Sequence, residues 1–248
     1  NLFMDISFVI TSYNYENYIK NCIDSCLLQE DHSKDYEILV INDGSTDRTQ
    51  VILEQYEGIP NITVYNIKNL GIEEASNFGF KKSLGKYIVR VDADDMILPN
   101  YIKSIEKAID SNEDFIYTNY STINSKGEVL IKNSNLPLFD VNEIMSRGDF
   151  LATGTAYKNE ILSSMNGYNT MIRNSGLENY ELILNLIQKG FLGYYVQEIS
   201  FLYRRHDQNI SKLKKDAIIK NGYKLFNKLG LGNYRTNKFH PYELRINQ

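Results

Sequence analysis

Acidic side chains one residue apart are the clearest sign of chemistry in this sequence. Asp92 and Asp94 follow the apolar stretch Tyr87–Val91, and Asp95 lies beside them. Carboxylates this close repel one another unless a proton or a cation relieves the repulsion. Oxygen ligands favour Mg²⁺ or Mn²⁺, which readily share phosphate oxygens with a nucleotide. We therefore expect Asp92 and Asp94 to serve a metal–diphosphate group; capping of the helix after Pro99 is an alternative that suits Asp95.

Two further apolar stretches also end in polar residues. Residues 6–11 run into TSYN (11–14), and residues 37–42 run into NDGS (42–45). Such residues are common in turns, so each segment alone is weak evidence. At the carboxyl ends of parallel strands, however, they would converge on the rim where open α/β sheets bind ligands.

The elements that would position these residues alternate between strand and helix. β-rich apolar runs predict strands, and apolar residues at helical spacing predict helices. The predicted strands cover residues 6–11, 37–42, 61–66 and 87–91, and the predicted helices cover 18–27, 45–56 (capped by Ser45), 73–83 and 99–109. This order predicts an α/β fold: a mostly parallel, Rossmann-like sheet with helices on both faces.

The second half of the chain is less regular. We expect strands at 115–120, 129–131, 193–196 and 201–203, a turn at 124–127, a helix at 178–188, and a lysine-rich helix from Ser211 to about Leu229. Glycines at 230 and 232 should loosen the chain after that last helix.

Composition is that of a folded protein. The 248 residues are 42% hydrophobic and 23% charged, which excludes a disordered or fibrous chain and allows one large domain. No apolar run approaches the roughly 18 residues that cross a bilayer, and the first residues lack a signal-peptide pattern. The two cysteines, Cys22 and Cys26, are expected to be buried free thiols.

Charge is distributed unevenly along the chain. The net charge is −4, which argues against nucleic acid as a partner. Residues 203–248 nevertheless carry 11 Lys and Arg against three Asp and Glu, a net of +8. This basic end is expected either to meet an anionic partner, such as a membrane surface or a phosphate-bearing ligand, or to be an ordinary solvated helix face.

An ordered set of segments extends from Ile6 to about Ser211. They are FVITSYN, ILVINDGSTDRT, NLGIEEASNFGFKKSLGKYIVRVDADDMILP, TGTAYKNEIL with NGYN, GLENYELILNLIQKG and YRRHDQNIS. In this order they resemble the family 2 glycosyltransferases of GT-A fold, of the bacterial surface-glycan type. The resemblance implies a GT-A domain over residues 1–211, with a nucleotide-binding half (1–98) and an acceptor-binding half (99–211), followed by a basic helical extension (212–248).

The resemblance also implies roles for individual residues. Tyr13 would stack on the nucleobase and Asp43 would accept a hydrogen bond from the ring N–H of the base, which suits uracil and also thymine. Tyr13 could instead be a core residue and Asp43 a turn former. Further nucleotide contacts are expected from Thr11, Asn14, Asn77, Arg90 and Asp92. Relatives often have a basic residue where this chain has Ser76, and Arg90, Arg204 or Arg205 could take over its role at the phosphates.

Metal and acceptor residues follow from the same resemblance. Asp94, with Asp92 and His206, would hold Mn²⁺ or Mg²⁺ against the donor diphosphate, whereas a surface imidazole is the ordinary alternative for His206. Gly154, Thr155 and Tyr168 would line the acceptor pocket, unless their segments form a plain β-turn and bulge.

The expected catalytic base departs from the family pattern. Relatives usually carry Glu-Asp ahead of an aromatic and an acidic residue, whereas this chain has Glu178 and Asn179 ahead of Tyr180 and Glu181. An amide cannot accept the proton, and a missing base costs on the order of 10²- to 10⁴-fold in rate. Either Glu178 or Glu181 acts instead, or Asn179 is an introduced substitution, or the natural protein is impaired.

The expected function is transfer of a sugar, with inversion, from a nucleotide-diphosphate sugar, most simply a UDP-sugar. The expected acceptor is a hydroxyl of a glycan or lipid-linked molecule of lipopolysaccharide or capsule synthesis, reached from the cytoplasm at the inner membrane face. A nucleotide-sugar-binding protein is the alternative that Asn179 raises. A sugar nucleotidyltransferase would need a glycine-rich loop, which TSYNYENY lacks.

Overall fold

The computed structural model describes residues 3–151, 153–234 and 237–239. The strands are β1 (Ile6–Ser12), β2 (Tyr36–Asp43), β3 (Ile62–Ile67), β4 (Tyr87–Asp92), β5 (Met96–Ile97), β6 (Phe115–Ile123), β7 (Val129–Ile131), β8 (Ala156–Lys158) and β9 (Gly193–Arg204). The helices are α1 (Ile19–Leu27), α2 (Thr49–Leu53) with the 3-10 turn η1 (Glu54–Tyr56), α3 (Ile72–Lys82), α4 (Tyr101–Asp110), α5 (Val141–Arg147), α6 (Asn159–Ser164), α7 (Glu178–Gln188), α8 (Ile210–Leu213) and α9 (Lys215–Leu229).

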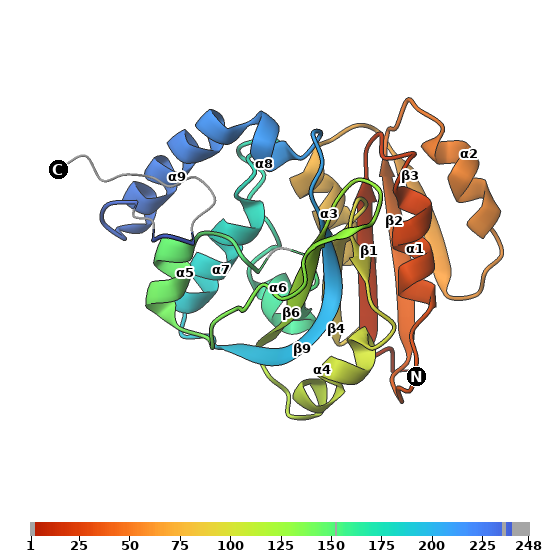
Figure 1. Ribbon diagram of the computed structural model, residues 1–248, viewed down its shortest axis with the longest axis horizontal. Coiled ribbons are helices and arrows are strands. Elements are labelled where there is room, and N and C mark those ends of the chain that lie inside the picture. Colours follow the sequence, from red (N-terminus) through yellow and green to blue (C-terminus); the bar gives the residue numbers. More distant parts are fainter. Residues whose placement is uncertain (1–2, 152, 235–236, 240–248) are drawn as a thin grey trace.

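These strands form one sheet in the order β3-β2-β1-β4-β8-β6-β9-β5, with β7 paired to β6. Strands β1 to β4, β6 and β9 of this sheet are labelled in Figure 1. The first half is parallel, because each of its strands returns through a helical crossover. In the second half β6 and β9 are parallel, whereas β8 runs antiparallel between β4 and β6, and β5 antiparallel to β9. The predicted α/β fold is confirmed, with antiparallel ladders added in the second half.

Each face of the sheet has its own hydrophobic core. Successive strand residues point to opposite faces, so Phe8 and Ile10 of β1 pack with α1 and α4, while Val9 packs with α3 on the other side. Ile102, Ile105 and other apolar residues at helical spacing place one buried face of α4 on the sheet. Helices on both faces thus hold the strand ends in fixed positions.

Several elements differ from the sequence-based expectation. The two strands expected at 193–196 and 201–203 are one continuous strand, β9, because it is paired with β6 along its length through a bulge. The short elements α5, β8 and α6 lie where no element was predicted. Ser45 does not cap α2: that helix begins at Thr49, and the Ser45 hydroxyl instead accepts a hydrogen bond from the Asn14 N–H at 3.0 Å.

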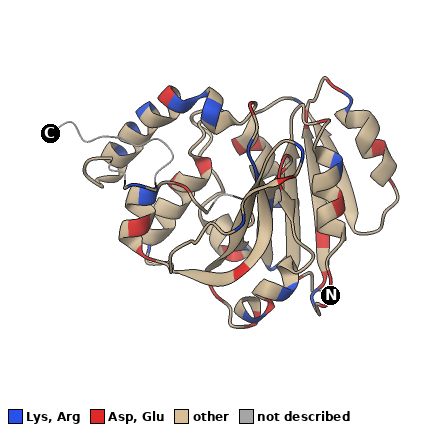
Figure 2. Ribbon diagram, viewed as in Figure 1, with Lys and Arg blue, Asp and Glu red and all other residues tan. Residues whose placement is uncertain are grey.

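The lysine-rich helix is present as α8 and α9. Ile218, Leu225 and Phe226 of α9 are buried in the same core as residues of α5 and α7. Lysines recur along this helix pair (Figure 2), and those of α8 and α9 are exposed. The domain boundary after residue 211 stays a prediction, and residues 240–248 of the predicted extension lie outside the described part of the chain.

Both cysteines are buried and free, as predicted. Within the described residues, no helix combines the length and apolar character needed to cross a bilayer.

Candidate active site

The polar strand ends come together as the sequence predicts. In the sheet register Thr11 of β1 lies beside Asp92 of β4, and Ser12 lies beside Asn42 of β2. The parallel direction of these strands brings their carboxyl ends to one edge. The edge therefore gathers polar groups from three strands that are distant in sequence.

Three carboxylates form the centre of this edge. Oxygens of Asp92, Asp94 and Asp95 all lie within 4.8 Å of one another. One oxygen of Asp95 accepts a hydrogen bond from the Arg204 N–H at 2.8 Å, while its Oδ2 is buried without a hydrogen-bond partner. Helix capping by Asp95 is thus wrong, since α4 begins after Asn100 and Asp95 points into the cluster.

The carboxylate cluster has an electrostatic cost that a cation would offset. Burial raises the pKa of Asp94, and the neighbouring charge of Asp92 adds to this rise. Burial likewise raises the pKa of Asp95, with further contributions from the other two carboxylates. Three converging oxygens, one of them an orphaned buried acceptor, are a donor set that fits a hard divalent cation.

His206 lies where the sequence predicted, next to this cluster. Its Nε2 is 2.7 Å from Asp94 Oδ2, and its Nδ1 accepts a hydrogen bond from the Gln208 N–H at 3.1 Å. Because Nδ1 accepts, Nε2 carries the hydrogen of the neutral ring and donates it to Asp94. The ring of Tyr18 contacts both this imidazole, with ring centres 5.0 Å apart, and the guanidinium of Arg204, whose carbon is 4.8 Å from the Tyr18 ring centre.

Arg90 links the carboxylate cluster to the start of α7. The buried guanidinium donates from Nε to Asp92 Oδ1 at 3.0 Å and from Nη1 to Glu178 Oε1 at 3.0 Å. Its carbon also lies 5.4 Å from the centre of the Tyr168 ring. Arg90 thereby fixes the two carboxylates relative to each other, a role that the sequence did not indicate.

Asn179 is buried beside a carboxylate that sequence reasoning missed. Its Nδ2 donates to Asp149 Oδ1 at 3.1 Å and to Oδ2 at 3.3 Å. Its Oδ1 accepts from the hydroxyls of Tyr157 at 2.8 Å and Tyr168 at 3.3 Å. Asp149 follows α5 in a segment without a recognisable motif, 30 residues before Asn179, so nothing in the sequence pattern pointed to it.

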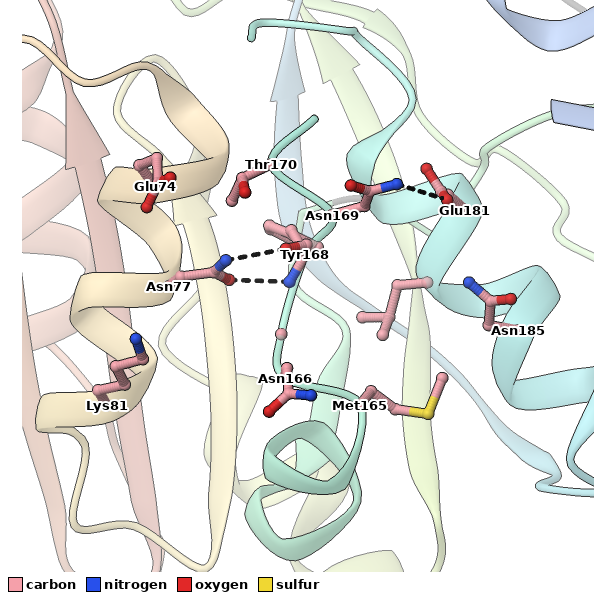
Figure 3. A pocket seen from close by; sticks show the side chains of 12 residues that line it. Glu74, Asn77, Lys81, Met165, Asn166, Tyr168, Asn169, Thr170, Glu181 and Asn185 are labelled. Carbon is pink, nitrogen blue, oxygen red and sulfur yellow. Dashed lines mark hydrogen bonds between the residues drawn. The ribbon is translucent and has the colours of Figure 1, made fainter. Parts of the chain in front are cut away.

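The other expected catalytic residue of α7, Glu181, faces a different region. Its Oε1 accepts from Asn169 Nδ2 at 3.0 Å and pairs with Lys228 Nζ of α9 at 3.2 Å. It lines a cavity of about 360 Å³ between α3 and α7, where the bond to Asn169 is visible (Figure 3). Glu178 and Glu181 are thus separated, and Glu178 is the one that joins the carboxylate edge.

Asn77 is on the opposite wall of the same cavity. Its amide donates to the Tyr168 carbonyl at 2.9 Å and accepts from the Tyr168 N–H at 2.8 Å (Figure 3). Both ends of this side chain therefore bind the loop after α6. The loop includes Gly167, whose φ of +67° suits glycine. Asn77 thereby positions Tyr168, whose ring lies against the Arg90 guanidinium.

The nucleotide residues expected on β1 and β2 differ in exposure. Tyr13 is 44% exposed at the edge, whereas Asp43 is buried. Asp43 accepts the Leu70 N–H at 2.7 Å and the Gly71 N–H at 3.0 Å, and burial raises its pKa. Asn14 Oδ1 accepts the Thr46 N–H at 2.7 Å, which ties the loop after β1 to the loop after β2.

The residues expected at the acceptor pocket are buried. Gly154 accommodates a φ of +79° and donates its N–H to the Arg90 carbonyl at 3.1 Å. The Thr155 hydroxyl bonds to the Leu151 carbonyl, and Tyr168 extends its hydroxyl toward Asn179. In this arrangement they support the loop that connects Asp149 to the carboxylate edge.

Comparison with known families and sequences identifies the family to which the chain is similar. Residues 7–180 match the model described as Glycosyl transferase family 2. A chondroitin synthase from Pasteurella multocida (strain Pm70) is 28% identical over 94% of this chain, which corresponds to 24% of that protein. A hyaluronan synthase from Pasteurella multocida is also 28% identical over 94% of this chain and 24% of its own length. The chain therefore spans about a quarter of the length of these relatives.

A solved structure extends the comparison to the fold. S. aureus TarS (residues 1–349) in complex with UDP-GlcNAc matches with a TM-score of 0.73 at 18% identity, over 92% of this chain and 66% of that chain. At this identity the likeness concerns the fold.

Proposed function

Since this chain belongs to glycosyl transferase family 2 and has the GT-A fold, we propose that it transfers a sugar from a nucleotide-diphosphate sugar to an acceptor hydroxyl. The observation that carries the proposal is the cluster of Asp92, Asp94 and Asp95 at the carboxyl edge of the sheet. Such a cluster is costly to assemble unless a proton or a cation relieves the repulsion, and a divalent cation suits its oxygen ligands. A metal-bound diphosphate supplies both the cation and a leaving group.

The metal would be Mn²⁺ or Mg²⁺, held by oxygens of Asp92, Asp94 and Asp95. When bound, the cation stabilises the negative charge that develops on the departing nucleoside diphosphate. His206 would orient Asp94 through the 2.7 Å hydrogen bond or join the ligand set itself. Arg90 fixes the position of Asp92 from the other side.

The nucleotide would lie along the ends of β1 and β2, with uracil as the base. The exposed ring of Tyr13 is available for stacking on the base. Asp43 already accepts two backbone N–H groups, but each carboxylate oxygen has a second lone pair for a ring N–H. Thr11 and Asn14 shape the loop between them. The relative TarS, whose structure contains UDP-GlcNAc, supports a UDP-sugar as donor.

The acceptor would be a hydroxyl of a glycan or a lipid-linked glycan, attacked in a single inverting displacement. The names of the chondroitin and hyaluronan synthases, which refer to polysaccharides, support a glycan acceptor. We place the reaction in the cytoplasm, at the inner face of the membrane. The exposed lysines of α8 and α9 would provide peripheral contact with anionic lipids.

A second candidate function follows from Asn179, the amide at the expected base position. A chain without a base could bind the nucleotide sugar and not transfer it. Isothermal titration of UDP with and without Mn²⁺, together with a UDP-release assay over a panel of UDP-sugars, distinguishes the two functions. We expect Mn²⁺-dependent UDP binding and release of UDP with at least one donor. Binding without release would favour the second candidate, and neither binding nor release would refute both.

A further inference from the structure

We propose that Asp149 is the general base of this reaction, in place of the carboxylate that relatives carry at the position of Asn179. This inference rests on the proposed function. It assigns a catalytic role to a residue outside the family motif. It also explains why an amide at position 179 need not abolish activity.

The side chain of Asn179 is matched to a carboxylate neighbour. Tyr157 and Tyr168 donate their hydroxyls to its Oδ1, so its Nδ2 must face Asp149, which accepts at 3.1 and 3.3 Å. An aspartate at position 179 would place a second carboxylate against Asp149, and the two could not both be ionised at low cost. Asn179 and Asp149 together therefore have one carboxylate, as the family pattern does with its aspartate at position 179.

The three carboxylates near this position differ in their cationic partners. Glu178 forms a buried ion pair with Arg90, and Glu181 pairs with Lys228. Among the described residues, no lysine, arginine or histidine forms an ion pair with Asp149. Asp149 therefore differs from the two glutamates in that its side-chain partner is the neutral amide of Asn179 and not a cation.

The surroundings of Asp149 tune it for this task. Burial raises its pKa to about 6, and the charge of Glu178 adds to the rise, whereas the hydrogen bond from Asn179 and the charge of Arg90 oppose it. The phenols of Tyr157 and Tyr168, which contact Asn179, and of Tyr180 on α7 have pKa values raised by burial and remain neutral. A base with a pKa slightly below neutral pH is ionised and still basic enough to assist.

Asp149 is also connected to the carboxylate edge through its loop. The residue as a whole is only partly buried, and its carboxylate accepts hydrogen bonds from Asn179 Nδ2 and from the Leu151 N–H at 3.3 Å. Its loop continues to Thr153, whose hydroxyl accepts the Asp92 N–H at 3.4 Å, and this connects the base to the carboxylate edge. The acceptor O–H proton would pass to Asp149. The acceptor oxygen would bond to the anomeric carbon, and the bond from that carbon to the diphosphate would break, with its electrons leaving on UDP.

The test replaces the Asp149 carboxylate by an amide of the same shape. With the UDP-sugar that supports turnover, Asp149→Asn should lower kcat at least 100-fold, while the Kd for UDP in Mn²⁺ changes less than threefold. In the unmodified chain kcat should fall at acid pH with a midpoint near pH 6, and this fall should be absent in Asp149→Asn. Asp140→Asn is the matched control: this residue caps α5 nearby, an asparagine caps equally well, and kcat should be unchanged.

Two further variants keep the proposal falsifiable. Asp149→Glu keeps a carboxylate and should retain more activity than Asp149→Asn, even if both variants are less stable. Asn179→Asp should give no gain and should move the midpoint of the fall at acid pH to higher pH, because two adjacent carboxylates share a proton. A hundredfold gain in Asn179→Asp, or kcat above a tenth of the original in Asp149→Asn, would overturn the role of Asp149 alone. If the unmodified chain releases no UDP from any donor, the proposed function fails first.

Discussion

The guanidinium of Arg90 and the carboxylate of Glu178 form a buried ion pair, with Nη1 and Oε1 3.0 Å apart and both side chains less than a tenth exposed. The two residues are 88 positions apart in sequence. Arg90 lies on the central strand β4, and Glu178 begins α7. The pair therefore fixes the start of the helix that carries Asn179 against the strand that carries Asp92.

Breaking this pair should destabilise the fold. Removing one partner of a buried ion pair leaves an uncompensated charge, which costs about 3–5 kcal/mol. We expect Arg90→Ala to lower the free energy of unfolding by that amount in urea titrations. Lys20→Ala, which removes an exposed pair with Asp24, should cost less than about 1 kcal/mol and serves as the control. An equal loss of unfolding free energy in the two variants would show that the buried pair contributes no more to stability than the exposed one.

Metal binding at the carboxylate edge can be tested separately from turnover. Asp94→Asn should weaken UDP binding in Mn²⁺ at least tenfold and leave the much weaker binding in EDTA unchanged. The reason is that an amide removes a charge that the cation needs. His206→Ala should have a smaller effect, since His206 contacts Asp94 and Asp94 remains. Titration calorimetry measures the UDP affinity of both variants. The control is Asp110→Asn, which alters a surface ion pair with Lys34. A Mn²⁺-dependent Kd that is unaffected by Asp94→Asn would place the metal elsewhere.

The parts of the site that sequence could predict are those fixed by local pattern. The edge formed by Asp43 and Asp92 follows from strand ends, and parallel pairing is enough to bring them together. Alternation along β4 also puts Arg90 and Asp92 on the same face, so that contact could have been inferred from the two-residue period. The contacts of Arg90 with Glu178 and of Asn179 with Asp149 could not be inferred from the sequence, because they depend on how α7 packs.

Asp149 shows the same limit more clearly. It lies in the loop between α5 and β8, elements too short to leave a periodic signal. The helix α7, by contrast, has a strong apolar period and was predicted over its full range of 178–188. Sequence therefore placed Asn179 correctly on its helix and gave no indication of the carboxylate that it binds.

The loop that carries Tyr168 depends on a glycine at position 167. A Cβ there would lie 2.2 Å from Asn77 Oδ1, and the φ of +67° is unfavourable for other residues. Gly58 has a φ of +83° but open space around it, so Gly58→Ala measures the backbone cost alone, about 1–2 kcal/mol. Gly167→Ala should cost at least about 1 kcal/mol more in urea unfolding, because the Asn77 amide must move. An equal loss of unfolding free energy in the two variants would mean that the Asn77 side chain can move without cost.

The lysine face of α8 and α9 can be tested without removing the helix. Deletion of residues after 211 would remove Ile218 and Phe226 and so uncover the core residues of α5 and α7 that they pack with, so charge reversal is the cleaner change. Lys214→Glu, Lys220→Glu and Lys224→Glu together should reduce binding to phosphatidylserine vesicles more than tenfold, since each lysine near an anionic surface contributes about 1 kcal/mol. Binding of the unmodified chain should also weaken as salt is raised.

The control for that experiment reverses three exposed lysines elsewhere. Lys86→Glu, Lys126→Glu and Lys132→Glu change the net charge by the same amount at exposed positions in connecting segments away from α8 and α9. If membrane contact is local to α8 and α9, this second triple variant should keep most of its vesicle binding in a sedimentation assay. An equal loss in both triple variants would mean that net charge governs binding. No binding by the unmodified chain at low salt would refute the membrane contact altogether.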